Sequence, residues 1–294
     1  MEKVSRDIFT FENPCRKCCL TIAGSDSGGN AGVQADLRAF HYYGRHGCTV
    51  FAALTAQNPF GVSAIHAVPA DFVAAQLDAV LGVYDIGALK TGMLSDPAAI
   101  EVIADRLAKH PEIAKVIDPV MVATSGVRLV SEETVEKIQK LLLPLATLIT
   151  PNLPEAEVLL GNTVDDPNAE RLASAEHAAD LARALHAKYG CAVLVKGGHG
   201  ASASAVDVLF DGTAISSYTL PWVDHPVSTH GTGCSLGAAL AAELTAGKSL
   251  ADAVAGAKAY VHGAIANSYW VGERCGVLGL PEDPPPCGKK LCNL

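Results

Sequence analysis

The segment STHGTGC, residues 228–234, contains the residue types that could carry out a reaction. Cys234 stands at the start of an alanine- and leucine-rich run that predicts a helix, and His230 precedes it by four residues. A thiol in this place could be a nucleophile paired with the histidine, a metal ligand, or a group that handles a proton beside a bound anion. The residues around it distinguish these possibilities.

Gly231, Thr232 and Gly233 favour the third possibility. Their backbone N–H groups would lie at the helix N-terminus, where unpaired donors and the helix dipole attract an anion such as phosphate. A glycine cap without a function is the alternative for this motif. The nucleophile is less well supported, because the sequence offers no identifiable third group to orient the imidazole of His230.

The composition limits the classes of protein to which the chain can belong. With 294 residues, 49% of them hydrophobic and 18% charged, the chain is too apolar to be disordered. No apolar run reaches the roughly 18 residues of a membrane helix. The formal net charge of -9 argues against nucleic acid or an anionic membrane as a partner. Because the N-terminus lacks the pattern of a signal peptide, we expect a cytoplasmic protein with reduced cysteines.

Cysteines gather near the two ends of the chain: Cys15, Cys18 and Cys19 at the start, and Cys275, Cys287 and Cys292 at the end. A zinc site that joins the termini is one interpretation. Plain packing is favoured over it, because no second C-x-x-C pair is present and two of these residues begin an apolar strand.

Short apolar runs alternate with amphipathic helical patterns along the chain. Strands are expected at residues 18–24, 49–56, 88–94, 115–121, 147–152 and 192–198, and helices at 69–82, 96–110, 131–146 and 174–190. This alternation is typical of a parallel sheet that is covered on both faces. The sequence therefore predicts one doubly wound α/β domain.

The last third of the chain predicts additions to that domain. Asp211-Gly212 lies between two alternating runs, which indicates a β-hairpin added to the sheet. Two closing helices are expected at residues 234–247 and 249–270, the second opened by a Ser249/Asp252 capping pattern. The proline-rich tail, residues 281–294, is expected to be loose.

In open parallel sheets, ligands bind beyond the carboxyl ends of the strands. The glycine-rich segment GSDSGGNAG, residues 24–32, follows the first expected strand, but it does not fit G-x-G-x-x-G, and the chain has no P-loop. A dinucleotide-binding dehydrogenase is therefore disfavoured. The loop is better suited to a close approach between backbone and a small ligand.

Eight segments, in order from about residue 19 to residue 265, together resemble one family. They are TIAGSDSGGNAGVQADLRAF, ALTAQNPFGV, FVAAQLDAV, KTGML, DPVMVATSG, LITPNLPEAEVLLG, VLVKGGH and STHGTGCSLGAALAAEL. The family is that of the hydroxymethylpyrimidine/phosphomethylpyrimidine kinases of thiamine biosynthesis, which have the ribokinase-like fold. The resemblance implies an ATP- and Mg²⁺-dependent kinase that phosphorylates a hydroxymethylpyrimidine and its monophosphate.

The same resemblance implies an organisation of the chain. Residues 19–272 would form a single ribokinase-like domain, preceded by an N-terminal extension at 1–18 and followed by a C-terminal tail at 273–294. The family also leads us to expect a homodimer.

Roles for individual residues follow from the resemblance. Residues 231–234 would form the anion hole, and Cys234 would stand where most ribokinase-like enzymes have an aspartate base. A helix N-terminus lowers the pKa of a thiol, which would suit this role. Asp118 and Glu155 would hold Mg²⁺, since that ion takes few carboxylates and keeps several waters. The nucleotide side would consist of Lys196, Asn152 and Thr229, and the pyrimidine side of Gly24, Ala31, Asp36, Gln57, Met93 and Val120.

The expected pyrimidine contacts have a chemical rationale. The amide of Gln57 has a donor and an acceptor, the pair that an aminopyrimidine edge requires. Asp36 could accept a hydrogen bond from the substrate hydroxyl or amino group. Met93 would lie against the ring as an apolar, adaptable contact.

The chain departs from the family in the segment expected to fold over the site, where Thr124 and Val127 replace a usual Lys and Asp. Two other functions therefore stay open: a pyridoxal kinase of the same fold, and a non-catalytic sensor that binds a vitamer. The carboxylates, Lys196 and Cys234 favour an enzyme over a sensor. Gln57 with Met93 favours a pyrimidine over pyridoxal.

Overall fold

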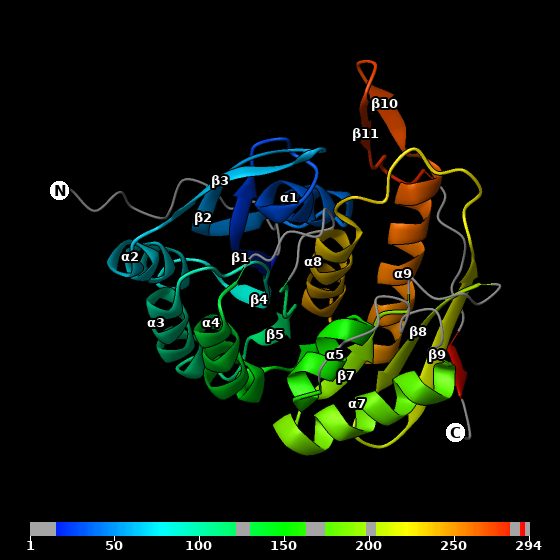
Figure 1. Cartoon of the computed structure of the whole chain (residues 1–294). Coiled ribbons are helices and arrows are strands. Elements are labelled where there is room, and N and C mark those ends of the chain that lie inside the picture. Colours follow the sequence, from blue (N-terminus) through cyan, green and yellow to red (C-terminus); the bar gives the residue numbers. More distant parts are fainter. Residues whose placement is uncertain (1–15, 122–129, 163–173, 198–203, 283–288, 292–294) are drawn as a thin grey trace, which may run out of the picture.

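The central feature of the fold is a ten-stranded, mainly parallel sheet with helices on both faces (Figure 1). The computed structural model describes residues 16–121, 130–162, 174–197, 204–282 and 289–291. In the part of the chain that it describes, no helix is long and apolar enough to cross a membrane.

The regular elements follow one another as strands and helices in alternation. The strands are β1 (Cys18–Asp26), β2 (Gly47–Asn58), β3 (Gly61–Ala67), β4 (Ile86–Thr91), β5 (Ala114–Ile117), β6 (Leu148–Ile149), β7 (Ala192–Val195), β8 (Ser204–Phe210), β9 (Ile215–Pro221), β10 (Tyr269–Val271), β11 (Cys275–Val277) and β12 (Lys289–Leu291). The helices are α1 (Gly32–Tyr42), α2 (Ala70–Leu81), α3 (Pro97–Ala108), α4 (Glu132–Lys137), α5 (Leu153–Leu160), α7 (Ala175–Tyr189), α8 (Thr232–Thr245) and α9 (Leu250–Ala266).

The strand order in the large sheet is β12-β9-β8-β7-β6-β5-β4-β1-β2-β3. The strands from β2 to β7 in this order are parallel, whereas β3 at one edge and β8, β9 and β12 at the other are antiparallel. The chain leaves β1 toward β2 and later returns to β4 on the other side of β1. The switch point of this doubly wound sheet therefore lies between β1 and β4, where ligands are expected.

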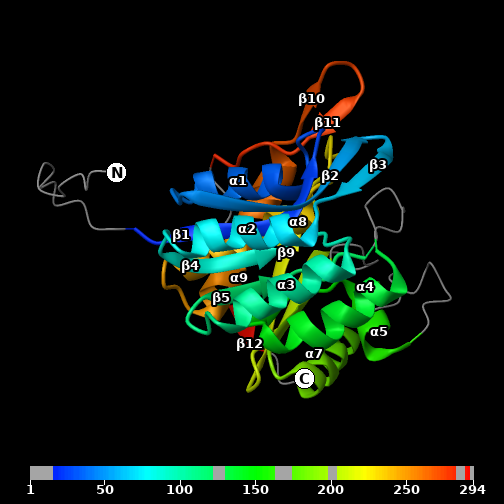
Figure 2. The same ribbon diagram turned by 90° about the vertical axis from the view of Figure 1, so that its left-hand side faces the viewer.

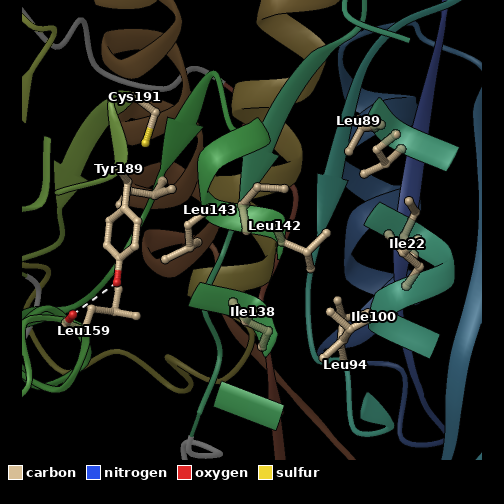
Figure 3. Close-up of a cluster of buried hydrophobic side chains, with 14 of the residues drawn as sticks. Ile22, Leu89, Leu94, Ile100, Ile138, Leu142, Leu143, Leu159, Tyr189 and Cys191 are labelled. Carbon is tan, nitrogen blue, oxygen red and sulfur yellow. Dashed lines mark hydrogen bonds between the residues drawn. The ribbon is translucent and has the colours of Figure 1, made fainter. Parts of the chain in front are cut away.

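Successive strand residues pack against opposite helical layers. Leu20 and Leu89 point into a large cluster with α2, α3, α4, α5 and α7, while their neighbours Cys19 and Ala88 pack with α1, α8 and α9. Figure 2 shows the first of these layers in front of the sheet. In Figure 3, strand and helix side chains of this cluster interdigitate, and the Tyr189 hydroxyl donates a 3.1 Å hydrogen bond to the backbone oxygen of Leu159.

Helix α8 is buried over most of its length from Ser235 onward, and many of its buried residues are small, whereas Thr232, Gly233 and Cys234 at its start are partly exposed. Ala238, Ala239, Ala241 and Ala242 are completely buried against the sheet and α9. Small side chains let the helix axis approach the strands closely, so the N-terminus of α8 is held firmly above their carboxyl ends.

The structure confirms most of the elements expected from the sequence. The six expected strands are present, and β8 and β9 form the expected hairpin, with Gly212 at φ 95° in its turn. Ser249 caps α9 by accepting a hydrogen bond from the N–H of Asp252 at 3.2 Å. The fold is the predicted single α/β domain.

Two local predictions need correction, and one further element was not predicted. The expected helix at 131–146 becomes a short α4, a π-helical turn (Ile138–Leu142) and a 3₁₀ turn that contains Pro144, which has no N–H to continue the α-helical ladder. The tail is not loose throughout, since β12 pairs with β9. The hairpin of β10 and β11, which crosses the expected domain end at residue 272, was not predicted.

Loss of the cap on α9 should destabilise the fold. We expect Ser249→Ala to lower the free energy of unfolding by about 1 kcal/mol, because the N–H of Asp252 loses its acceptor. Urea denaturation of the two proteins measures this change. Ser249→Asn keeps a capping acceptor and should leave the stability nearly unchanged; equal losses in both variants would show that the cap is not responsible.

Candidate active site

The N-terminus of α8 lies at the carboxyl edge of the sheet, against the loop that follows β1. Gly231, the N-cap residue, has φ 90°, and a Cβ there would come within 2.0 Å of the backbone oxygen of Asn30. Only glycine fits this left-handed, crowded position. The first N–H groups of α8 have no acceptor within the helix, although that of Thr232 donates to the backbone oxygen of Thr229 at 3.4 Å. The anion hole at residues 231–234 stays a prediction.

A lysine and a carboxylate lie directly beside this helix N-terminus. A Cβ on Gly233 would lie 3.8 Å from Lys196 Nζ and 3.9 Å from Asp118 Oδ2. Lys196 follows β7 and Asp118 follows β5, so the parallel strands deliver both side chains to the same edge. The structure thus brings together the predicted anion hole, one residue of the predicted nucleotide side and one predicted metal ligand.

Glu155 completes a cluster of three charged groups, in which both carboxylates are buried and Lys196 is partly exposed. Lys196 Nζ lies 2.9 Å from Asp118 Oδ1 and 3.9 Å from Glu155 Oε2, and Thr150 donates a 3.0 Å hydrogen bond to the same Asp118 oxygen. Burial raises the pKa of Glu155 to about 7; Lys196 opposes this effect and Asp118 adds to it. Two carboxylates therefore share one ammonium group.

Asn152 positions Glu155 through a capping box at the start of α5. Asn152 Oδ1 accepts from the Glu155 N–H and Glu155 Oε2 accepts from the Asn152 N–H, both at 2.8 Å. The N-x-x-E pattern thus has a structural role here. The third predicted nucleotide-side residue, Thr229, lies exposed before α8, with its backbone oxygen accepting a 3.0 Å hydrogen bond from the Thr232 hydroxyl.

The carboxylate cluster suits a magnesium ion by its chemistry. Asp118 and Glu155 supply hard oxygen donors, and when Glu155 is deprotonated their charges exceed the single charge of Lys196, so a cation would be attracted. Among the residues that the structure describes, no three or more His, Cys, Asp or Glu side chains form a metal cluster. Waters and phosphate oxygens would have to complete the coordination.

The environment of Cys234 corrects one prediction. Burial raises the pKa of the thiol above its ordinary value of 9.0, although Lys90 acts in the opposite direction. The expected lowering by the helix N-terminus does not prevail, because the thiol is largely removed from water and Asp36 and Asp118 are near. The thiol is therefore mostly protonated at neutral pH.

His230 does not form the nucleophilic pair that the spacing allowed. Its Nε2 lies 3.4 Å from the Gln57 Nε2 and 3.8 Å from Asp26 Oδ2, so the imidazole is directed toward β1 and β2. The sequence offered no third group to orient the imidazole, but the structure places Asp26 near it. Asp26 and Gln57 both lie near the same ring nitrogen, Nε2. Asp26 could not be recognised from sequence, because 204 positions separate it from His230.

Several predicted pyrimidine contacts lie at the switch point. A Cβ on Gly24 would come within 2.7 Å of Met93 Cε, so the absence of a side chain at residue 24 lets the methionine lie over β1. Ala31, Gln57 and Val120 are partly exposed near the carboxyl ends of β1, β2 and β5. The pyrimidine contacts of these residues stay predictions.

Asp36 is placed differently from the prediction. Its carboxylate is completely buried, accepts hydrogen bonds from Lys90 Nζ at 2.9 and 3.0 Å, and accepts another from the Thr21 hydroxyl at 2.6 Å. A direct bond to a substrate has no support in this geometry, because the side chain has no exposed surface. Asp36 instead holds Lys90, a residue that the sequence interpretation left without a role.

Some predictions fall outside the described residues. The segment with Thr124 and Val127 lies there, as do Cys15, Cys287 and Cys292. Of the other terminal cysteines, Cys19 is buried in β1 and its thiol donates to the Thr245 hydroxyl at 3.3 Å, which fits plain packing.

Fold and site together define the class of protein: a small-molecule kinase of the ribokinase-like fold. An ADP complex of pyridoxal kinase from Bacillus subtilis aligns with a TM-score of 0.80 and 34% identity over 90% of this chain and 97% of that chain. Phosphomethylpyrimidine kinase from Clostridium difficile aligns with a TM-score of 0.70 and 34% identity over 84% and 98% of the two chains.

Within this class, the chain belongs to the phosphomethylpyrimidine kinase family, whose model matches residues 26–279. A hydroxymethylpyrimidine/phosphomethylpyrimidine kinase from Rhizobium meliloti is 46% identical over 84% of this chain and 89% of its own length. The thiamine biosynthesis bifunctional protein ThiED from Geobacter sulfurreducens is 45% identical over 85% of this chain. The match spans 49% of that longer protein.

The raised pKa of Glu155 should make stability depend on pH. The folded protein keeps this proton to about pH 7, whereas an ordinary glutamate loses it near 4.5. The folded state binds more protons between these values, so the free energy of unfolding should fall as pH rises, by on the order of 3 kcal/mol. Urea denaturation between about pH 5 and 8 with a chelator present measures the slope. Glu155→Gln should flatten it, and parallel curves would contradict this assignment.

Proposed function

We propose that this protein transfers the γ-phosphoryl group of ATP to 4-amino-5-hydroxymethyl-2-methylpyrimidine, and then to its monophosphate, for thiamine diphosphate synthesis. One observation carries the proposal: at the N-terminus of α8, the place of a Cβ on Gly233 lies 3.8 Å from Lys196 Nζ and 3.9 Å from Asp118 Oδ2. Family membership and the ADP complex of the similar B. subtilis kinase support ATP as the donor.

The anion hole and the lysine would act on the transferred group. In phosphoryl transfer the substrate oxygen attacks the γ-phosphorus while the bond to the ADP oxygen breaks, and catalysis consists mainly of positioning and charge stabilisation. The amides of residues 231–234 would stabilise the negative charge that develops there, and Lys196, whose Nζ lies 3.8 Å from the place of a Cβ on Gly233, would add a positive charge beside them. Both are fixed before the substrate arrives, so little reorganisation is needed.

Magnesium would be held by Asp118 and Glu155, and it would supply further neutralisation of phosphate charge. The cluster needs this cation, because its own charges leave an excess of negative charge next to an anion-binding helix. Lys196 alone balances Asp118, to which it is bonded.

Cys234 would accept the proton of the substrate hydroxyl. Its pKa is raised by burial, so only a small fraction is thiolate at neutral pH, and the ammonium group of Lys90 favours that fraction. A weakly populated base is sufficient for a loose transition state, in which the proton can leave late. For the second phosphorylation the attacking group is a phosphate oxygen, which needs no base.

Pyridoxal kinase is the second candidate, because a pyridoxal kinase structure has the higher TM-score of the two compared above. A single assay separates the candidates. The purified protein is incubated with ATP, Mg²⁺ and either the hydroxymethylpyrimidine or pyridoxal, and the products are identified by mass. Mono- and diphosphorylated pyrimidine would support the proposal. Pyridoxal phosphate alone would replace it, and binding without turnover would indicate the sensor.

Light scattering on the same sample tests the expected homodimer.

Removal of the thiol should slow the reaction without weakening substrate binding. We expect Cys234→Ala to lower kcat for the pyrimidine by about tenfold to a hundredfold, the range for a base in a reaction that depends on it lightly. The KM for the pyrimidine should change little, because the anion hole consists of backbone groups. Steady-state kinetics measure both values.

The pH profile provides the second readout for Cys234. Because its pKa lies above 9.0, wild-type kcat should keep rising as pH increases toward that value, and the rise should be absent in the alanine variant. Cys191→Ala, at the opposite end of β7 in the buried core, is the matched control and should retain the wild-type profile. Identical profiles in wild type and Cys234→Ala would remove the base assignment.

Gln57 should determine the preference for a pyrimidine. We expect Gln57→Leu to lower kcat/KM for the pyrimidine, because the aminopyrimidine edge loses a donor and an acceptor. The corresponding free-energy barrier should rise by about 1–3 kcal/mol per unpaired polar group. Pyridoxal lacks that amino edge and should lose less. The two kcat/KM values are compared in wild type and variant, and a pyrimidine loss no larger than the pyridoxal loss would show that specificity lies elsewhere.

A further inference from the structure

His230 connects the loop before α8 with Gln57, the residue predicted to bind the pyrimidine edge. His230 lies directly before Gly231, and its backbone N–H is held by the Ser228 hydroxyl at 3.2 Å. Its side chain crosses to β2, where Nε2 lies 3.4 Å from the amide nitrogen of Gln57. A contact between two residues 173 positions apart thus connects the loop of α8 with the other side of the site.

The hydrogen-bonding capacity of Gln57 gives this contact a consequence. The Thr55 hydroxyl has one hydrogen and lies 2.8 Å from the backbone oxygen of Ser25, so its 3.2 Å contact with Gln57 Oε1 is the weaker of its two hydrogen bonds. The imidazole of His230, by accepting a hydrogen from Nε2, is therefore the partner that can determine which end of the amide is oxygen and which is nitrogen. One N–H and one oxygen lone pair remain for a ligand, which is the pair that an aminopyrimidine edge needs.

Asp26 binds the backbone of the loop that follows β1. Its carboxylate accepts hydrogen bonds from the N–H groups of Gly28, Asn30 and Ala31 at 2.8 to 2.9 Å, and so shapes the loop against which α8 packs. One of its oxygens lies 3.8 Å from His230 Nε2. Arg38 donates to the backbone oxygens of Gly29 and Asn30 in the same loop, so it faces the loop from α1.

We propose that His230 is a positioning residue for substrate specificity: its neutral Nε2 accepts a hydrogen bond from the Gln57 amide and thereby orients that amide toward the pyrimidine. The inference rests on the proposed function, because His230 would orient the amide of Gln57 that binds the pyrimidine.

A double-mutant cycle tests the proposal. We expect His230→Phe to raise the KM for the pyrimidine by about threefold to tenfold, the effect of one hydrogen bond, and to leave the KM for ATP unchanged. In the Gln57→Leu background the same change should have no further effect, because its target is gone. Additive losses, or a raised KM for ATP, would overturn the proposal and assign His230 to the anion-binding loop.

Two further variants separate orientation from simple packing. His230→Gln supplies an amide oxygen that can accept from Gln57 and should restore the pyrimidine KM to near the wild-type value. His41→Phe, at the exposed end of α1, is the control for an added aromatic side chain and should behave as wild type. A pyrimidine KM in His230→Gln as high as in His230→Phe would contradict the orienting role.

Wild-type turnover of the pyrimidine decides the proposed function separately: without it the function fails, whereas turnover with an unaltered KM in His230→Phe refutes only this inference.

Discussion

The ion pair between Asp36 and Lys90 is the interaction on which the rest of the site depends. Both side chains are completely buried, and the pair joins α1 to β4 beneath α8, where Lys90 Cγ lies 3.2 Å from the place of a Cβ on Gly237. Burial of two charges costs several kcal/mol per ion, and only good geometry compensates for it. Here Thr21 and both carboxylate oxygens provide that geometry, so β1, β4 and α1 are fixed at the switch point. Removal of either partner would leave a bare charge in the core and loosen all three elements.

A second group of charges extends this arrangement toward the phosphate side. Lys196 pairs with Asp118 and lies near Glu155, and the thiol of Cys234 lies within the electrostatic reach of both groups. Together the two groups contain three carboxylates and two ammonium ions, so the anion-binding end of α8 borders an acidic interior. Burial raises the pKa of the thiol and of Glu155, and the neighbouring carboxylates add to this effect. A bound cation would change the electrostatics of the entire site, because every titratable group in it senses the others.

The sequence was sufficient for the features that depend on local pattern. Alternating apolar strands and amphipathic helices predicted the doubly wound sheet, Asp211-Gly212 predicted a hairpin, and the glycines before an alanine-rich run predicted the N-terminus of α8. The features that it could not provide depend on contacts between distant segments. That Lys90 turns inward to Asp36 follows from the packing of α1 on β4, and the position of His230 beside Asp26 follows from the approach of two loops. The raised pKa of Cys234 likewise reflects burial, which no local motif encodes.

The capping box at the start of α5 couples helix structure to the charge cluster. Glu155 Oε2 accepts the N–H of Asn152, and the same oxygen is the one nearest Lys196. Anything that draws this oxygen toward a cation competes with the cap, and a firmer cap restrains the oxygen in turn. Thermodynamic linkage makes the two effects equal in size, so the affinity for a cation and the order of the first turn of α5 must vary together. The carboxylate that would bind the cation is thus also the acceptor that caps α5, so cation binding would change the order of the first turn of this helix.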